Sequence, residues 1–184
     1  MNKNIWKISK QFDFCYGHRV HNQTLNKEYS IDNRCVCRHL HGHQGTIIVA
    51  LRGEQLSNGM VTDFKHLNWF KKFLDDVLDH KFIIDKNDPM FRHIVPHPPT
   101  LDLEWKKFDE GYEIVDPNFF KFIESDNLIE ILEGFVVVDF VPTSENLSKW
   151  LFEIVQNKMS KINIEVESLQ FYETPKSQSI YGRE

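Results

Sequence analysis

The sequence has few cysteines, no long apolar run and no block of like charge, and each absence excludes a class of protein. Three cysteines among 184 residues form an odd set, unsuited to the disulfide framework of a secreted domain. No stretch reaches the roughly 20 apolar residues of a membrane-spanning helix. The start, residues 1–10, mixes Lys, Asn and Ser with apolar residues, unlike a signal peptide. We therefore expect a cytoplasmic protein with no membrane partner.

Charge and composition narrow the class further. The 22 basic and 27 acidic residues give a formal net charge of -5, and the two signs are interspersed along the chain. A nucleic-acid-binding protein usually carries a stripe of Lys and Arg, so we expect no nucleic-acid partner. The chain is 41% hydrophobic, with 15 Phe and 4 Trp, which is enough to bury one core. We expect a single domain over residues 1–184.

Apolar periodicity predicts four strands and two main helices. The predicted strands, with alternating apolar positions or β-branched runs, are residues 5–14, 45–52, 134–141 and 163–173. One helix should begin after the capping residue Asp63 and end near Asp79 and His80. A second should open in the run Pro142-Thr143-Ser144-Glu145-Asn146. Residues 85–133 show poor periodicity and several prolines, so we predict an inserted loop there, with one short helix around 118–124.

The densest group of metal-capable side chains runs from Cys35 to His43. His41 and His43 lie two residues apart at the start of a predicted strand, where alternation points both imidazoles to the same face. With His18 from the end of the first strand, they would supply three nitrogen ligands of an open zinc site, leaving a fourth position for substrate or water. An isolated His-x-His is usually an ordinary surface or core feature. The third histidine and the neighbouring thiols favour the metal site.

Six short blocks, in a fixed order, resemble the pterin synthases of the tunnelling fold. They are Tyr16-Gly17-His18-Arg19, Cys37-x-x-x-His41-Gly42-His43, Gly59-Met60-Val61-Thr62-Asp63-Phe64, Leu78-Asp79-His80, Pro142-Thr143-Ser144-Glu145-Asn146 and Glu173-Thr174-Pro175. The resemblance implies an α+β fold, in which a four-stranded antiparallel sheet carries two helices on one face. It also implies a homo-oligomer, a hexamer built as a dimer of trimers, whose sheets join into a barrel with sites between chains. The insertion at about 85–133 departs from compact members of this family.

Carried over residue by residue, the resemblance assigns the metal and the general base. His18, His41 and His43 would bind Zn²⁺, which would serve as the Lewis acid. A thiolate close to this cation has a lowered pKa and would abstract a carbon-bound proton. The carboxytetrahydropterin branch of the family places this cysteine at Cys37, and the pyruvoyl branch places it at Cys35. We favour Cys37, although the spacing alone does not separate the two branches.

The resemblance also assigns a proton relay and the contacts to the pterin ring. Asp79 and His80 would return protons to the substrate side chain. Glu173 would accept hydrogen bonds from ring N–H groups, with Thr174 and Glu145 as further contacts. Without the resemblance, simpler explanations suffice. A histidine at the C-terminal end of a helix, such as His80, interacts favourably with the helix dipole. An acid at the end of a strand, such as Glu173, can simply be solvated.

The implied reaction is the zinc-dependent conversion of 7,8-dihydroneopterin triphosphate to 6-carboxy-5,6,7,8-tetrahydropterin, acetaldehyde and triphosphate, a step of queuosine and 7-deazaguanine synthesis. Arg19, Arg38 and Lys176 suit the triphosphate by charge. The alternative is a 6-pyruvoyl-tetrahydropterin synthase with Cys35 as base. An alternative of another class is a non-catalytic pterin- or purine-binding protein, or a structural zinc protein. A structural site would have four protein ligands, whereas three histidines leave one position open.

Overall fold

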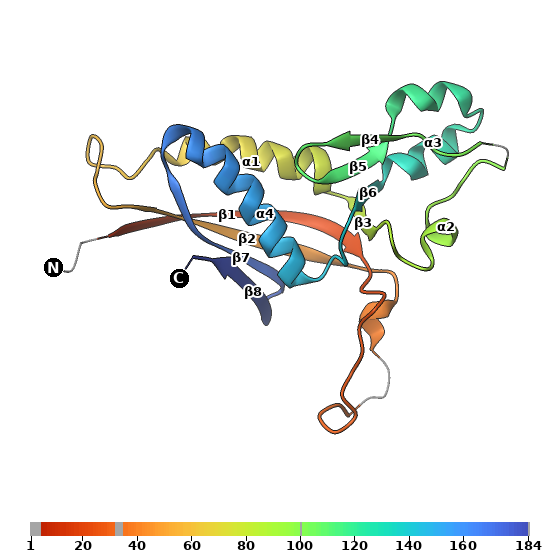
Figure 1. Ribbon diagram of the computed structural model, residues 1–184, viewed down its shortest axis with the longest axis horizontal. Helices are drawn as coiled ribbons and strands as arrows, with labels where there is room; N and C mark the ends of the chain where they lie inside the picture. The colour runs from red at the N-terminus through yellow and green to blue at the C-terminus, as the bar shows by residue number, and fades with distance from the viewer. Residues whose placement is uncertain (1–4, 32–34, 100, 184) are drawn as a thin grey trace. The chain divides into compact units, whose positions relative to one another are not determined.

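The computed structural model describes residues 5–31, 35–99 and 101–183, and its strands form a mixed sheet flanked by helices (Figure 1). In hydrogen-bonding order the sheet reads β4-β5-β6-β3-β1-β2-β7-β8. The strands are β1 Trp6–His18, β2 His41–Gly53, β3 Lys81–Asp85, β4 Trp105–Phe108, β5 Tyr112–Val115, β6 Phe135–Val138, β7 Glu165–Thr174 and β8 Ser177–Gly182. The α+β class is confirmed. The four-stranded antiparallel sheet is wrong, because the sheet has eight strands and the pairs β1–β3 and β3–β6 are parallel.

The chain divides into two compact units. The first comprises Met1–Cys15, His43–Asp79 and Ser144–Glu184, and the second comprises Tyr16–Gly42 and His80–Thr143. The long strands β1 and β2 contribute residues to both units. The single domain remains a prediction.

In the first unit, two helical segments pack on one side of β1, β2 and β7 (Figure 1). One runs from the 3-10 turn Phe64–Leu67 through α1 (Asn68–Phe73) to a π-helical turn, Leu74–Leu78, and the other is α4 (Ser144–Met159). The rings of Phe12 and Phe70 meet at 5.3 Å, and those of Phe73 and Trp150 at 6.3 Å. Asp63 begins the first segment by accepting a hydrogen bond from the Lys65 amide at 2.7 Å, as predicted. Both predicted helices are therefore present.

In the second unit, the insertion is an ordered part of the fold, and its description as a loop with one short helix is wrong. Residues 85–133 contain the hairpin β4–β5, the helices α2 (Phe91–Ile94) and α3 (Asp126–Glu133), and the 3-10 helix Pro117–Phe122. The 3-10 helix matches the short helix predicted at 118–124. Together with β3 and β6, these elements bury a core that comprises Ile84, Val95, Leu103, Val115, Phe119, Ile123, Leu132, Phe135 and Val137. Strands of four residues are too short to show a period, so composition alone did not reveal them.

Two further strands, β3 and β8, were not predicted. β3 begins one residue after His80 and pairs in parallel with the last three residues of β1. β8 follows a tight turn after β7 and pairs with it in antiparallel fashion. Within the described ranges, no helix combines the length and apolar character that crossing a bilayer requires.

A matched pair of substitutions on α3 tests whether the insertion has a true core. Leu132 is 1% exposed, whereas its neighbour Ile131 is 53% exposed. We expect Leu132→Ala to lower the free energy of unfolding by about 2–5 kcal/mol, because it leaves a cavity in a packed core. Ile131→Ala should cost about 0.5 kcal/mol or less. Urea denaturation followed by circular dichroism measures both, and equal effects would show that the insertion core is not packed.

Candidate metal centre

Three histidines converge where β1 ends and β2 begins. One ligand atom from each of His18, His41 and His43 can be chosen so that all lie within 4.8 Å of one another. His18 is buried at 1% exposure, and the other two are half-buried. The ring centroids of His18 and His41 are 4.5 Å apart. The structure therefore brings together the three residues predicted as metal ligands.

Backbone carbonyls set the tautomers of two of these rings. Nδ1 of His18 lies 2.7 Å from the Pro142 carbonyl oxygen, and Nδ1 of His41 lies 2.8 Å from the His39 carbonyl oxygen. A carbonyl oxygen only accepts, so each Nδ1 carries the proton and donates it. In the neutral ring, Nε2 then presents its lone pair. Metal-binding histidines commonly show this arrangement, in which a second group holds the ring by its other nitrogen.

Two glycines allow close packing of the backbone beside the candidate ligands. A Cβ at Gly42, between His41 and His43, would lie 2.9 Å from the Tyr16 carbonyl oxygen. A Cβ at Gly17, next to His18, would lie 2.6 Å from a ring carbon of Phe82. Both distances are too short for real carbon contacts, so any larger residue would push the backbone or its neighbour aside. The glycines beside the ligands are thus a steric requirement of the site.

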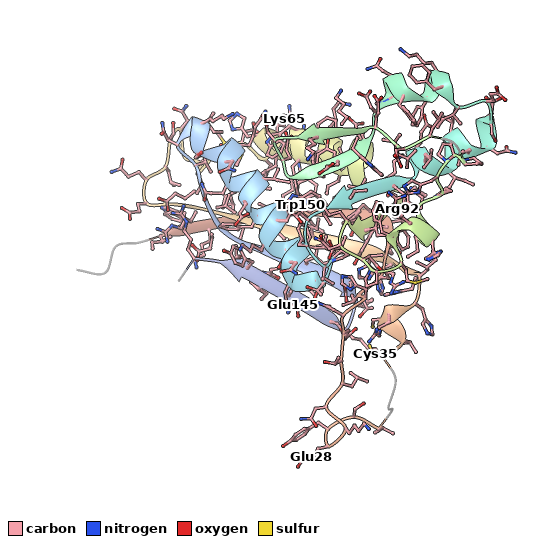
Figure 2. All side chains as sticks on the ribbon, turned by 45° about the vertical axis from the view of Figure 1, so that its right-hand side comes forward. Glu28, Cys35, Lys65, Arg92, Glu145 and Trp150 are labelled. Carbon is pink, nitrogen blue, oxygen red and sulfur yellow. The ribbon has the colours of Figure 1, made fainter. Side chains whose placement is uncertain are left out.

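The two candidate base cysteines lie on a short turn after the loop that follows β1. Cys37 belongs to the 3-10 helix Val36–Arg38, and its carbonyl accepts a hydrogen bond of 2.9 Å from the amide of Val20. Cys35 immediately precedes this helix and lies at the foot of the loop whose tip carries Glu28 (Figure 2). Both thiols are half-buried. Val20 lies two residues after His18, so its hydrogen bond to Cys37 ties the cysteine turn to the end of β1.

A cavity of about 500 Å³ opens beside this turn. Its lining includes Arg19, Gln23, Thr24, Cys35, Arg38 and His39. Cys35 is in the lining, while Cys37 is not among the residues that form it. The two predicted base candidates therefore differ in whether they line this cavity.

Asp79 and His80 follow a strained stretch of backbone. The Asp79 amide donates to the Leu74 carbonyl at 2.8 Å, the bond of a π-helical turn, and Asp79 Oδ1 accepts from the Cys15 amide at 2.7 Å. His80 has a φ of +59°, in the left-handed region that residues with a Cβ rarely adopt. π-helical turns and left-handed residues both occur preferentially at functional sites. The backbone thus supports a special role for this pair.

The residues predicted to contact the pterin belong to the first unit. Glu173 is half-buried on β7, where the register with β8 shifts between Tyr172 and Thr174. The Thr174 hydroxyl accepts from the Lys176 amide at 3.2 Å. Glu145 is exposed in the first turn of α4 and accepts from the Ser144 hydroxyl at 3.3 Å (Figure 2). Thr174 and Glu145 therefore have local structural uses, and Glu173 lies at an irregularity of the strand.

Two buried acids in the second unit were missed by the sequence reasoning. Asp85, at the end of β3, lies 3.0 Å from His21 Nε2, and Asp88 Oδ2 lies 3.0 Å from Arg19 Nε. Each acid is 4% exposed, and a buried carboxylate requires a partner. The partners are more than 60 residues away in the sequence. The only signal in the sequence for these two acids was their position next to the end of a strand.

Polar contacts continue around the end of β6. Asn87 donates to the carboxylates of both Asp85 and Asp139, each at 3.1 Å. Hydrogen bonds from Lys86 and Asn87 hold the pKa of Asp139 below its usual value. The segment that begins the insertion is therefore tied to the strand ends beside it.

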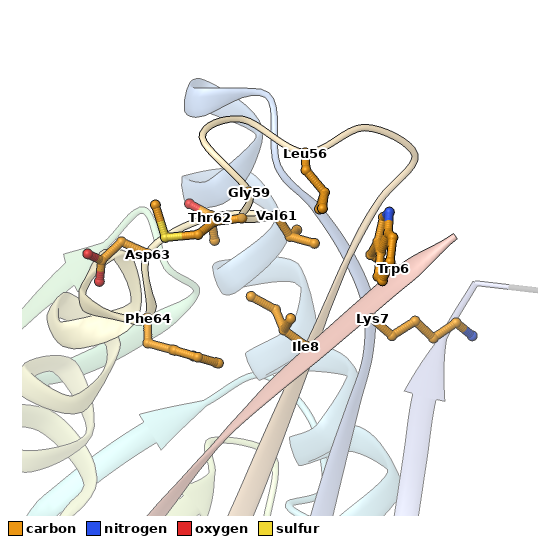
Figure 3. A pocket seen from close by; sticks show the side chains of 10 residues that line it. Trp6, Lys7, Ile8, Leu56, Gly59, Val61, Thr62, Asp63 and Phe64 are labelled. Carbon is orange, nitrogen blue, oxygen red and sulfur yellow. The ribbon is translucent and has the colours of Figure 1, made fainter. Parts of the chain in front are cut away.

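A second cavity, of about 390 Å³, lies in the first unit (Figure 3). Its lining is largely apolar and includes Trp6, Ile8 and Leu56, together with the block Gly59-Met60-Val61-Thr62-Asp63-Phe64 that carried part of the resemblance. Gly59 adopts a φ of +79°, which a tight turn here requires. This block thus shapes a turn and caps a helix.

Comparison with known proteins identifies the family. The profile of the family described as 6-pyruvoyl tetrahydropterin synthase matches residues 7–184. The chain belongs to this family. The predicted resemblance to pterin synthases is confirmed.

Individual members are similar over nearly the whole chain. The 6-carboxy-5,6,7,8-tetrahydropterin synthase of Aquifex aeolicus strain VF5 is 31% identical, with 97% of this chain and 99% of that protein covered. The solved structure of an uncharacterized protein from Wolinella succinogenes is 49% identical, with a TM-score of 0.91 and coverage of 98% and 99%. The 6-pyruvoyl tetrahydropterin synthase of Caenorhabditis elegans is 22% identical, with a TM-score of 0.56 and coverage of 100% and 99%. This last likeness supports the shared fold.

The glycine between two histidines offers a test of the metal centre in this family member. We expect Gly42→Ala to weaken Zn²⁺ binding about tenfold or more, because its Cβ would press on the Tyr16 carbonyl and shift the ligand-bearing start of β2. Gln44→Ala, an exposed change two residues further along β2, should leave the affinity unchanged. Competition with a chromogenic zinc chelator measures both. Equal affinities in the two variants would refute the steric requirement.

Proposed function

We propose that this chain is a zinc-dependent 6-carboxy-5,6,7,8-tetrahydropterin synthase that converts 7,8-dihydroneopterin triphosphate and one water molecule to 6-carboxytetrahydropterin, acetaldehyde and triphosphate, within queuosine and 7-deazaguanine synthesis. The observation that carries the proposal is the similarity, across almost the full chain, to a relative that bears this name. The convergence of three histidines gives the same proposal a chemical basis.

The donor set fits Zn²⁺. Three imidazoles with one position left open form the usual ligand set of catalytic zinc, and carbonyl bonds hold two of these rings in the ligating tautomer. When bound, zinc would polarise an oxygen of the substrate side chain and acidify the adjacent C–H group. His18 contributes rigidity to this set, because its ring is buried and held by the Pro142 carbonyl.

The chain's own residues would move the protons. Cys37 would remove the acidified proton as a thiolate, from a turn that the Val20 amide holds in place. Asp79 and His80 would return protons at the neighbouring carbon. The Cys15 amide fixes one Asp79 oxygen, so the carboxylate cannot rotate freely. The left-handed backbone of His80 sets the direction in which its ring leaves the chain.

Binding of the pterin ring would fall to the first unit. Glu173 would accept hydrogen bonds from two adjacent N–H groups of the ring, a geometry that suits a carboxylate. Thr174 and Glu145 would lie around it. We also propose a homo-oligomer, a dimer of trimers, because β8 is an edge strand with no charged residue to discourage pairing with another chain.

One observation favours a second candidate, 6-pyruvoyl-tetrahydropterin synthase activity. Cys35 lines the cavity next to His39, whose carbonyl holds the His41 ring. A base at Cys35 is what the pyruvoyl branch would use. The two candidates differ in whether a two-carbon fragment leaves the substrate, so product mass separates them.

Anaerobic incubation of the zinc-loaded protein with 7,8-dihydroneopterin triphosphate tests the proposal. We expect carboxy product and an equal amount of acetaldehyde, detected by mass spectrometry and a coupled aldehyde assay. Cys37→Ala should lower kcat about 100- to 10,000-fold, since it removes a general base, while Cys35→Ala should retain most of the activity. A pyruvoyl product that is lost with Cys35→Ala would establish the second candidate. No turnover by the wild type would leave a pterin-binding relative.

A further inference from the structure

The cavity beside the cysteine turn has the composition of an anion-binding site. Two arginines, Arg19 and Arg38, and one histidine, His39, lie in its lining, and the described residues that form the lining include no carboxylate. Its volume of about 500 Å³ falls in the ordinary range for small-ligand sites. An elongated polyanion is the class of ligand that two guanidinium groups would recognise best.

Both guanidinium groups are held in place by contacts within the protein. Arg19 Nε lies 3.0 Å from Asp88 Oδ2, and the Arg19 side chain is only 14% exposed. Asp88 is itself fixed, because its other oxygen accepts the Met90 amide at 2.8 Å. Arg38 Nη1 donates to the carbonyl of Gln23, another residue of the cavity lining, at 3.3 Å. Orientation before binding lowers the entropic cost of capturing a ligand.

The contacts already made leave donors available. A guanidinium group has five N–H donors, and Asp88 lies beside the Nε edge of Arg19 as an ion pair without a directed hydrogen bond. The carboxylate offsets one positive charge, so the two arginines and Asp88 together carry a charge of about +1. Such a site holds an anion mainly by directed hydrogen bonds and can release it again.

The cavity shares its backbone with the metal centre. Arg19 directly follows the ligand His18, and the carbonyl of His39 accepts the Nδ1 proton of the ligand His41. Both facts concern one compact unit. Two of the three histidines, His18 and His41, are thus joined to the cavity lining through an adjacent residue and one backbone hydrogen bond. In the proposed substrate, the triphosphate terminates the same side chain whose carbons react.

We propose that Arg19, Arg38 and His39 form the subsite for the triphosphate group of the substrate, with Asp88 as the residue that positions Arg19. This inference rests on the proposed function for the identity of the ligand. It assigns to Arg38 a role in binding, which raises KM when lost, and no role in the proton transfers that set kcat.

Isothermal titration of the zinc-loaded protein with inorganic triphosphate, and separately with inorganic phosphate, tests the subsite directly. Zinc analysis of the protein after each titration checks that the metal stays bound. We expect triphosphate to bind at least tenfold more tightly than phosphate, and Arg38→Gln to weaken triphosphate binding about tenfold or more. The triphosphate affinity of Arg38→Lys should lie between those of the wild type and Arg38→Gln, because lysine keeps the positive charge and lacks the paired N–H donors of the guanidinium group. Arg92→Gln is the matched control, since Arg92 is an exposed arginine of the same unit outside the cavity lining.

Steady-state kinetics with 7,8-dihydroneopterin triphosphate separate the two proposals. Arg38→Gln should raise KM about tenfold and change kcat less than about threefold. Normal turnover with an unchanged KM and unchanged triphosphate affinity in Arg38→Gln would overturn the subsite and leave the proposed function standing. Triphosphate binding that depends on Arg38 in a protein without turnover would support the anion site while the proposed function fails. If Arg92→Gln weakened triphosphate binding as much as Arg38→Gln, the net charge of the protein alone would account for the binding, and the subsite would also be overturned.

Discussion

The close approach of two strand ends is the constraint on which the rest of the site depends. The last residues of β1 and the first of β2 run so near to each other that a Cβ at Gly42 would lie 2.9 Å from the Tyr16 carbonyl oxygen. This approach brings His18 and His41 within ring contact. The carbonyls of Pro142 and His39 then turn both rings into the same tautomer. Geometry of this kind is set by the backbone.

The insertion contributes to the same arrangement. Its first residues carry Asp85 and Asp88, which hold the loop after His18 through His21 and Arg19. Removing one partner of such a buried pair leaves an uncompensated charge, which is far more costly than the pair itself is stabilising. The insertion core, built around residues such as Leu132, anchors the elements that follow these acids. A segment without clear periodicity thus supports the wall of the cavity that Arg19 lines.

The cluster of three histidines could be predicted from the sequence because the physics there is local. Alternation along a strand places His41 and His43 on one face, and a second strand end supplies His18. The helix that Asp63 begins was predicted for the same reason, because a capping residue and the apolar face of a helix are both defined by residues close together in the sequence. The order of the six family blocks supplied the fold class.

The eight-stranded sheet and the buried acids could not be predicted in this way. β4 and β5 have four residues each, and β8 is exposed and polar at most positions, so none of the three shows a clear apolar alternation in the sequence. The pairs Arg19–Asp88 and His21–Asp85 join residues more than 60 positions apart. The choice between Cys35 and Cys37 also exceeds local spacing, because it depends on where the substrate side chain lies.

X-ray absorption at the zinc edge tests the central claim, an open centre of three histidines, most directly. For the zinc-loaded wild type, the account predicts three nitrogen ligands at about 2.0–2.1 Å and one light-atom ligand that exchanges with added anions. A sulfur ligand at about 2.3 Å, with no exchangeable position, would mean that Cys35 or Cys37 closes the site. That result would contradict the catalytic account and point to a structural zinc site.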